Sequence, residues 1–580
     1  MVKAYTFSKI YPLDGGGGTG GGGGRAYTAI VCEDGVIAAI GGEEILKDYP
    51  QAGVTRMDGK IAYPGFFDAH LHVLQYGIAL GTCFVGDCAD SGELIARLKE
   101  YANSGGLAPG RPVWARGFNE TKFSDGVMPD RYMLDGVCAD RPVIAVRACG
   151  HLAAANTAML KKAGIERGGP VPGGYIDADE NGVPNGIVRE NALGMLYNAL
   201  DELTVTEIKE AILRAQAALF SKGISAVCSD DISSLRDEGN YGLVMAAFGE
   251  LAREGKLKLR VYEQARLLDA GMLKRFIGDG YRPHYNCGNF SIASLKIMAD
   301  GSLGARTAYM REPYEDDAAS RGIMVQPKEE IEELVAAAHE AGMPVAIHAI
   351  GDAAIDVALD AIDKAQKAQK ARPSSGPGLV TGLDSGPSLV TGPETGPAPS
   401  NAPAISPRHA VVHCQITDAA QIARFAELGV LAMIQPVFVA TDMLMAEARI
   451  GAKRLAASYN WKGFADAGVR YPCGSDCPVE DPDVLANIYC AVTRKTLAGE
   501  PAGGWMPEQR LSVGEALRGF TAEGAYACYA EDVLGSLAPG KYADMIVLDR
   551  DLFGIPADEI KDVAVESVII GGETVYTKSS

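Results

Sequence analysis

Hydrophobic and polar positions alternate in blocks along most of the chain, from about residue 204 to residue 476. Apolar residues recur at helical spacing in segments such as 206–223 and 328–342, and each such segment precedes a short apolar run. This alternation is typical of parallel β/α architecture. The predicted strands are IAYPGFFDAHLH, ISAVCS, LKLRVYEQARL, SIASLKIMAD, MPVAIHA, HAVVHC, VLAMIQP and VRYPCGS. Eight strands with intervening helices predict a closed (β/α)8 barrel of the TIM type.

Other segments interrupt and flank this pattern. Residues 78–203 separate the first strand from the next helix and are too long for a loop, so we expect an inserted subdomain that forms a lid and contacts substrate. Residues 1–60 and 531–580 contain short β-like runs with glycine turns, and we expect them to join in one small composite β-sandwich. The barrel then comprises residues 61–77 and 204–530.

Two segments have compositions unlike the rest. Residues 15–24, GGGGTGGGGG, lack the spacing of a phosphate-binding loop and predict a flexible hairpin tip. Residues 371–407 are rich in Pro, Gly and Ser and predict a mobile insertion between a helix and the sixth strand. In a barrel of this type such a connection lies at the face opposite the active site.

Composition and charge exclude several classes of function. The chain has 580 residues, of which 47% are hydrophobic and 22% charged, as in ordinary globular proteins. Its formal net charge of −20 repels phosphate, so a nucleic-acid partner is not expected. The start of the chain lacks the apolar core of a signal peptide, and no stretch approaches the roughly 18 apolar residues of a membrane span. With its 12 scattered cysteines, the pattern favours a cytoplasmic protein with reduced thiols.

Metal-ligand residues occur at the ends of several predicted strands. The chain has only eight histidines. Four of them, with one aspartate, end such strands: His70, His72, His348, His413 and Asp476. His70 and His72 are two residues apart on a strand and therefore point to the same side. Because active sites of these barrels lie at the carboxyl ends of the strands, the residues predict one metal centre, most simply for Zn²⁺.

Lys296 lies in the fourth predicted strand, within the same series. Burial and nearby cations lower the pKa of an amine, and a neutral amine can react with CO₂ to form a carbamate. A carbamate on Lys296 would bridge two ions and balance part of their charge. The alternative is that Lys296 forms a salt bridge, for example with Asp300.

With these residues in place, the chain resembles the amidohydrolase superfamily, and within it amidohydrolase family 3, which includes N-substituted formamide deformylases. The motifs that carry the resemblance are PGFFDAHLH, SLKIMADGSLGART, HAIGDAAID, HCQ, IQP, GSDCPV and LAPGKYADMIVLD. The resemblance covers nearly the whole chain. It implies a distorted barrel, a composite β-sandwich and hydrolysis of an amide-type C–N bond, and it suggests a homodimer.

The sequence departs from the family in three places. The glycine run and the 371–407 insertion look foreign to the family core. Many relatives have Gln-Pro-x-His after the seventh strand, whereas here Phe438 follows Gln435, Pro436 and Val437. This difference concerns a polar substrate contact and leaves the metal ligands unaffected.

The predicted reaction is attack of a metal-activated hydroxide on the carbonyl of an N-formyl or N-acyl amine. Asp476 is expected to accept the proton of the attacking water and to deliver it to the leaving amine. His151 is predicted to contact the substrate carbonyl, with a buried structural histidine as the alternative. Further candidates for substrate contacts are Phe118, Asn119, Glu120, Arg306 and Gln435.

Other functions remain open at this point. The same centre could serve a deaminase or a hydrolase of lactones or esters, because activated water attacks any suitable electrophilic carbon. A non-catalytic scaffold, as some hydantoinase-like relatives have become, could dispense with several of the ligands. The substrate, the native metal and the number of ions, one or two, do not follow from the sequence.

Overall fold

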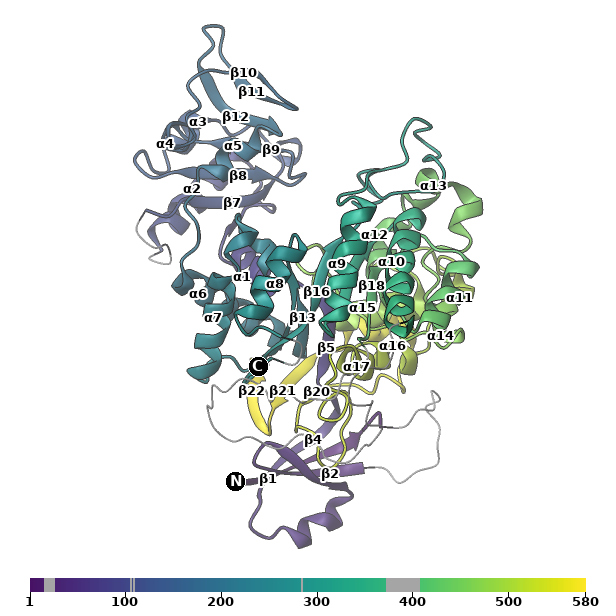
Figure 1. Ribbon diagram of the computed structural model, residues 1–580. Helices are drawn as coiled ribbons and strands as arrows, with labels where there is room; N and C mark the ends of the chain where they lie inside the picture. The colour runs from purple at the N-terminus through teal and green to yellow at the C-terminus, as the bar shows by residue number, and fades with distance from the viewer. Residues whose placement is uncertain (15–26, 105–106, 108–109, 283–284, 372–406, 580) are drawn as a thin grey trace. The chain divides into compact units, whose positions relative to one another are not determined.

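A computed structural model describes the chain except for residues 15–26, 105–106, 108–109, 283–284, 372–406 and 580. The glycine run and nearly all of the 371–407 insertion therefore lie outside the described residues. The chain forms two compact units: Met1–Tyr76 with Ile208–Ser580, and Gly77–Glu207. Each unit has its own sheet or sheets (Figure 1).

Seven parallel strands form the centre of the larger unit, in the order β19-β18-β17-β16-β14-β13-β5. They are β5 (Phe66–Leu71), β13 (Ile224–Ser229), β14 (Arg260–Arg266), β16 (Phe290–Met298), β17 (Val345–Ala349), β18 (Ala410–His413) and β19 (Leu431–Met433). A short antiparallel strand, β15 (Asn286–Cys287), pairs with β16. All residues of β5 and β13 are buried, as expected for strands covered on both faces.

The eighth predicted strand is an irregular segment that closes the barrel. On one side, Ala432 N–H donates to the carbonyl of Arg470 (2.9 Å), and on the other, Ala69 N–H donates to that of Cys473 (2.9 Å). Pro472 has no N–H group, which prevents a regular ladder here. The segment still joins β19 to β5, so the predicted distorted (β/α)8 barrel is confirmed, with seven regular strands and one irregular closure.

Helices connect and cover the strands (Figure 1). Helix α6 spans Val205–Ser221. It has a single buried stripe, as the amphipathic spacing predicts, formed by Ile208, Ala211, Ile212, Ala215 and Leu219. The other helices of the barrel are α7 (Gly242–Arg253), α8 (Ala270–Gly278), α9 (Lys328–Glu340), α10 (Asp352–Ala371), α11 (Ala419–Leu428), α12 (Phe438–Asp442), α13 (Ala446–Leu455), α14 (Trp461–Asp466), α15 (Val484–Thr493), α16 (Val513–Gly519) and α17 (Ala522–Ala527).

Both chain ends contribute to one seven-stranded sheet, in the order β22-β21-β20-β4-β1-β2-β3, where the N-terminal and C-terminal colours meet in Figure 1. The edge strand β3 also forms a hydrogen bond with the segment just before β20: Ile37 N–H donates to the Lys541 carbonyl (2.8 Å). The sheet thereby folds over a core of its own, which includes Phe7, Ile30, Met545 and Ile569. The strands are β1 (Val2–Ile10), β2 (Tyr27–Glu33), β3 (Val36–Gly41), β4 (Gly53–Pro64), β20 (Met545–Leu548), β21 (Val565–Ile570) and β22 (Glu573–Thr577).

The unit Gly77–Glu207 has a separate seven-stranded sheet, in the order β10-β11-β12-β9-β8-β7-β6. Hydrophobic clusters that contain Leu94, Phe118, Leu160 and Leu196 lie within this unit. The strands are β6 (Cys83–Phe84), β7 (Val113–Phe118), β8 (Val143–Arg147), β9 (Leu152–Ala155), β10 (Gly169–Val171), β11 (Gly174–Ala178) and β12 (Pro184–Glu190).

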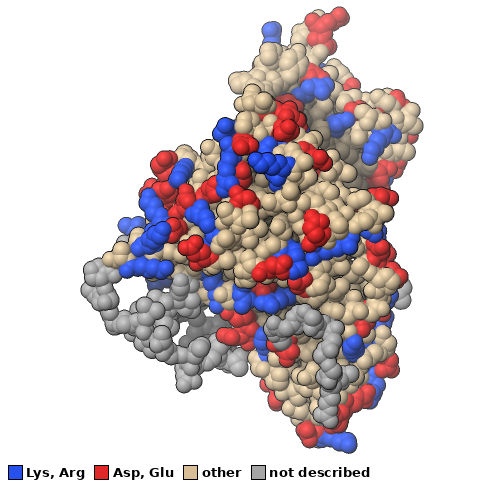
Figure 2. Space-filling model, turned by 90° about the vertical axis from the view of Figure 1, so that its right-hand side faces the viewer, with Lys and Arg blue, Asp and Glu red and all other residues tan. Residues whose placement is uncertain are grey.

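Acidic and basic side chains are interspersed on the face shown in Figure 2, so the excess of acidic residues forms no continuous single-sign area there. Among the described residues, no helix combines the length and apolar character needed to cross a bilayer.

Two buried histidines, His339 and His409, form a hydrogen-bonded pair near the N-terminal ends of β17 and β18. Val345 N–H donates to His409 Nδ1 (3.1 Å), so the His409 proton is on Nε2 and is donated to His339 Nδ1 (2.8 Å). His339 Nε2 in turn donates to the Gln369 side-chain oxygen (2.8 Å). Both rings must be neutral for this arrangement, and burial together with the neighbouring His339 lowers the pKa of His409 to about 3.

The hydrogen-bonded pair His339 and His409 predicts that the free energy of unfolding decreases at acidic pH. The His409 pKa is about 3 in the folded state and about 6.5 in an unfolded chain, so between these pH values the unfolded state binds more protons. Stability is therefore complete above pH 6.5 and decreases as the pH falls, by about 2 kcal/mol between pH 7 and pH 5. The unfolding midpoint of the parent should drop more over this range than that of His409→Asn, whose amide oxygen can still accept from Val345. Parallel pH curves for the two proteins would contradict this assignment.

Candidate functional site

The six predicted metal-ligand residues lie at one end of the barrel. His70 is in β5 and His72 follows this strand, while Lys296, His348 and His413 are in β16, β17 and β18. Strand register places His413 one residue beyond the level of His348, because Ala349 pairs with His413, and places Lys296 two residues before that level, because Lys296 pairs with Ala346. Asp476 follows the irregular closing segment, and its N–H donates to the His70 carbonyl (2.8 Å).

These side chains converge on one another. The His70 ring centroid lies 5.3 Å from that of His72 and 5.6 Å from that of His413, which is 4.3 Å from that of His348. Asp476 Oδ1 lies 3.4 Å from His70 Nε2 and 3.3 Å from His72 Nε2. Lys296 Nζ donates to His70 Nε2 (3.0 Å). Residues up to 406 positions apart thus meet in one cluster, with His70, His72 and Asp476 in the geometry of a candidate metal site.

Hydrogen bonds fix the tautomer of each imidazole. Nδ1 of His70 donates to the Gln264 side-chain oxygen (2.7 Å), Nδ1 of His72 to the Asp230 carbonyl (2.8 Å), and Nδ1 of His413 to the Gln435 side-chain oxygen (2.9 Å). In His70 and His413 Nε2 therefore keeps its lone pair, whereas Nε2 of His72 lies 3.3 Å from Asp476 Oδ1 and donates to it. His348 differs, because its Nε2 donates to the Gly301 carbonyl (3.1 Å) and leaves Nδ1 free. His70, His348 and His413 therefore each offer one unprotonated nitrogen, as a metal ligand requires, and a bound cation would take the place of the proton between His72 and Asp476.

Electrostatics also favour a cation at this cluster. Burial lowers the pKa of His70 and of His348 well below the usual range and that of His413 to about 4, so these rings are neutral. Burial also lowers the pKa of Lys296. Burial alone would raise the pKa of Asp476, but the His72 hydrogen bond and the surrounding histidines lower it, so this carboxylate is ionised. Neutral imidazoles with an ionised carboxylate are donors that suit a divalent metal ion.

The backbone at two of these residues is strained. His413 has φ of 79° and Asp476 has φ of 59°, in the left-handed region that non-glycine residues rarely adopt. Such strain costs about 1–3 kcal/mol per residue and persists where the surrounding structure enforces it. Hydrogen bonds from His413 Nδ1 to the Gln435 side-chain oxygen and from Asp476 N–H to the His70 carbonyl hold this geometry.

Two buried carboxylates brace the cluster. Asp68 accepts from the N–H groups of His70 and Ser475 (3.1 Å each) and so joins β5 to the closing segment. Asp300 accepts from the N–H groups of Ile350 (3.0 Å), Gly351 (2.9 Å) and Tyr309 (2.8 Å). Asp300 therefore holds the residues that follow His348. It was one expected partner of Lys296, but the Lys296 side chain donates to His70 instead.

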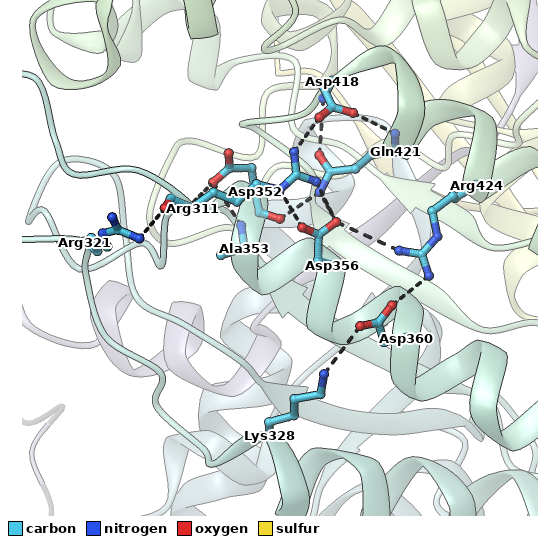
Figure 3. A network of polar contacts seen from close by, with 10 residues as sticks. All are labelled: Arg311, Arg321, Lys328, Asp352, Ala353, Asp356, Asp360, Asp418, Gln421 and Arg424. Atoms are coloured by element: carbon cyan, nitrogen blue, oxygen red, sulfur yellow. Dashed lines mark hydrogen bonds and ion pairs between the residues drawn. The ribbon is translucent and has the colours of Figure 1, made fainter.

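Arg311 anchors the segment that follows β16 (Figure 3). The guanidinium of Arg311 pairs with Asp356 of α10 and with Asp418, the N-cap of α11. The backbone N–H of Arg311 donates to the Asp352 carboxylate (2.9 Å). Arg424 and Lys328 extend the network through Asp360. The carbonyl of Tyr309, two residues before Arg311, also accepts from Ala354 N–H (3.2 Å). The network therefore fixes the 299–327 segment against the helix that follows His348.

Replacing Arg311 with methionine should loosen this segment. The change leaves Asp356 and Asp418 without their cation, at a cost of about 1 kcal/mol because the arginine is 38% exposed and water screens its pairs. Chymotrypsin should cleave faster after Tyr309 and Tyr314, as mass spectrometry of the fragments would show. Lys328→Met is the matched control, since Lys328 lies at the edge of the same network, and equal cleavage rates in both variants would refute the anchoring role.

The predicted substrate contacts lie in varied surroundings. In the unit Gly77–Glu207, Phe118 is fully buried in a hydrophobic cluster, and the Asn119 side chain caps a short 3-10 helix. Glu120 pairs with Arg147 (2.8 Å). His151 is 71% exposed and bonds to Glu190 (3.0 Å), so it is not a buried structural histidine.

In the larger unit, Arg306 forms a two-armed pair with Asp316 (3.0 and 2.9 Å). Gln435 is buried and bonds to His413, so it supports a candidate ligand. The Phe438 ring lies parallel to that of His413 at 6.2 Å. The sequence predicted these residues to contact substrate. In the structure the side chains of the polar residues among them form hydrogen bonds or ion pairs with other protein groups.

No pattern in the sequence distinguishes the supporting residues Gln264, Asp68 and Asp230. Asp68 lies two residues before His70, and Gln264 is in a strand without a candidate ligand. Only the strand order, which places β14 between β13 and β16, shows that Gln264 comes close to His70.

Comparison with known proteins agrees with this arrangement. The profile of the amidohydrolase family matches residues 57–388 and 400–576. The chain is 30% identical to the putative amidohydrolase YtcJ of Bacillus subtilis over 561 residues, with 95% of this chain and 96% of the relative covered. It is 24% identical to the N-substituted formamide deformylase of Arthrobacter pascens, with 95% of each chain covered.

Among solved structures, an uncharacterized metal-dependent hydrolase from Pyrococcus furiosus superposes with a TM-score of 0.74 at 27% identity and covers 95% of this chain and 99% of its own. The motifs from PGFFDAHLH to LAPGKYADMIVLD predicted this relationship. The chain belongs to the amidohydrolase family.

Proposed function

We propose that this protein is a metal-dependent hydrolase that cleaves a non-peptide amide C–N bond in a small N-formyl or N-acyl amine. Membership of the amidohydrolase family supports hydrolysis, and the Pyrococcus furiosus neighbour supports metal dependence. The observation that carries the proposal is the convergence of four imidazoles, an amine and a carboxylate at the mouth of the barrel. The name of the Arthrobacter pascens relative favours formamides within this class.

The donor set fits one or two divalent ions, for which Zn²⁺ is the first candidate because imidazole and carboxylate ligands suit it. His70, His72, His348, His413 and Asp476 would hold the metal. When bound, the ion would lower the pKa of water to about 7 and polarise the scissile carbonyl.

Asp476 performs the proton transfers in this proposal. Its Oδ1 lies within 3.4 Å of the Nε2 atoms of His70 and His72, so the carboxylate is part of the cluster that would hold the ion. It is ionised and can accept the water proton, and it then returns that proton to the nitrogen of the leaving amine.

Lys296 is proposed to carry a carbamate. Burial lowers its pKa and so favours the neutral amine, whose nitrogen can attack CO₂ and release one proton. The product would be an anion on β16 beside His70, which would suit a site with two cations. The alternative is an unmodified amine that remains hydrogen-bonded to His70 Nε2.

Metal analysis joined to a substrate panel tests the function. The purified protein is assayed with N-formyl and N-acyl amines, with release of the primary amine as the readout, before and after chelation. We expect amine release that stops on chelation and returns with Zn²⁺. Ammonia release from amino-heterocycles, or hydrolysis confined to esters or lactones, would instead support the second candidates, which use the same centre.

Turnover of no substrate by a metal-loaded protein would favour a non-catalytic scaffold. The donor set argues against that outcome, because a scaffold could lose several of these residues without consequence and here all six converge. A cytoplasmic location and a homodimer complete the proposal, and fractionation with light scattering would check them.

A further inference from the structure

We propose that Asp230 is an additional ligand of the metal centre and supplies its second carboxylate. The inference rests on the metal dependence proposed above. Asp230 was not among the residues predicted from the sequence, because it follows a strand, β13, that carries no histidine.

Backbone pairing places Asp230 beside His72. Ser229 of β13 pairs with Leu71 of β5, so the next residues, Asp230 and His72, stand at the same level on neighbouring strands. Asp230 N–H donates to the Leu71 carbonyl (3.0 Å), and the Asp230 carbonyl accepts from His72 Nδ1 (2.8 Å). Asp230 is thus held at the rim where the candidate ligands converge.

The Asp230 carboxylate is buried and accepts few hydrogen bonds from the protein. The residue is 1% exposed, and its one carboxylate hydrogen bond among the described residues comes from Ser233 N–H, at 3.4 Å. A buried carboxylate with so few partners is unfavourable unless a cation compensates it. Asp68 and Asp300, also buried near the site, each accept from backbone N–H groups at 3.1 Å or less.

The adjacent Asp231 provides an internal comparison. It is equally buried, but its oxygens accept from Leu74 N–H (2.7 Å) and from the Ser229 hydroxyl (2.8 Å). Asp231 is therefore satisfied by the protein and has a structural role. Of these two neighbouring carboxylates, only Asp230 lacks such compensation.

The charge of Asp230 acts on the candidate ligands. Asp230 lies close enough to Lys296 and to His72 for its negative charge to favour the cationic form of each side chain. Lys296 nevertheless donates to His70, and no ion pair within 4.0 Å joins it to Asp230 among the described residues. A buried carboxylate that lies near these groups without pairing with them could bind a cation there.

A second carboxylate changes the charge balance of the centre. Asp476 and Asp230 together neutralise one divalent ion without a carbamate. A second ion would restore an excess of positive charge, and the Lys296 carbamate would then reduce it. Asp230 therefore makes a one-ion centre electrostatically complete.

Two adjacent substitutions test the inference, with cobalt(II) as the probe. Metal-free parent, Asp230→Asn and Asp231→Asn proteins are titrated by calorimetry, bound cobalt is counted by elemental analysis, and the visible absorption bands are recorded. Asparagine at 230 retains the backbone carbonyl that holds His72. We expect Asp230→Asn to lose one equivalent of cobalt or at least about tenfold in affinity, with altered bands. Asp231→Asn should bind within threefold of the parent and unfold at a lower temperature.

Unchanged stoichiometry, affinity and bands in a folded Asp230→Asn protein would overturn the inference while leaving metal dependence intact. A parent protein that binds no cobalt would instead refute the proposed metal centre itself. Should Asp230→Asn fail to fold, X-ray absorption and a crystal structure of the cobalt-loaded parent decide the matter. A ligand oxygen lies about 2.0–2.2 Å from the ion, and an Asp230 carboxylate beyond that range would also overturn the inference.

Discussion

Replacing Asp476 with asparagine should lower turnover by roughly 10²–10⁴-fold, the usual contribution of a positioned acid–base group. Asparagine keeps the shape of the side chain and one oxygen near His70 and His72, which lie 3.4 and 3.3 Å from Asp476 Oδ1. It cannot accept and return a proton. We therefore expect the variant to bind metal and to retain its fold while amine release nearly stops.

Asp481→Asn is the matched control for this experiment. Asp481 lies five residues further along the same loop, is 67% exposed and pairs with Lys222 (2.9 Å). Its replacement should leave turnover within twofold of the parent. An Asp476→Asn enzyme with turnover within a few-fold of the parent would exclude the proton-transfer role.

Replacing Gly474 with alanine should open the barrel at its irregular closure. A β-carbon on Gly474 would lie 2.5 Å from the His70 nitrogen and 2.8 Å from Asp68 Oδ1 and from the His70 carbonyl oxygen. The backbone of β5 cannot yield as a flexible side chain would, so we expect a loss of about 1–3 kcal/mol of stability. The shift also separates Asp476 from His70, and metal affinity and turnover should fall together.

Gly278→Ala provides the control, because a β-carbon there meets nothing within 4 Å. Gly278 ends α8, where alanine should change the free energy of unfolding by no more than about 1 kcal/mol. Urea unfolding and cobalt titration of both variants measure the contrast. Equal stability of the two variants would show that the closing segment tolerates displacement.

Much of the fold could be predicted from periodicity. The seven regular barrel strands coincide with apolar runs, because burial on both faces requires such runs, and all of them except β5 come after amphipathic helices. The eighth failed as a regular strand because Pro472 cannot donate to a ladder, although hydrogen bonds on both sides still hold it in place.

The site was predictable where ligand type and strand end coincided in the sequence, as at His348 and His413. Supporting residues were not, since Gln264 and Asp230 come close to the histidines only through the order of strands in the sheet. The ion pairs between Arg306 and Asp316 and between Glu120 and Arg147 were not predictable either, because surface ion pairs leave no pattern in the sequence.

The irregular closure joins residues near 70 and residues near 476, and the proposed ligands come from both sides of it. A bound ion would therefore link the two sides of this irregular closure. At a free metal concentration one hundred times the dissociation constant, binding adds about 2.7 kcal/mol to the stability of the folded chain. The working lifetime of this enzyme should accordingly depend on the metal supply of the cell that makes it.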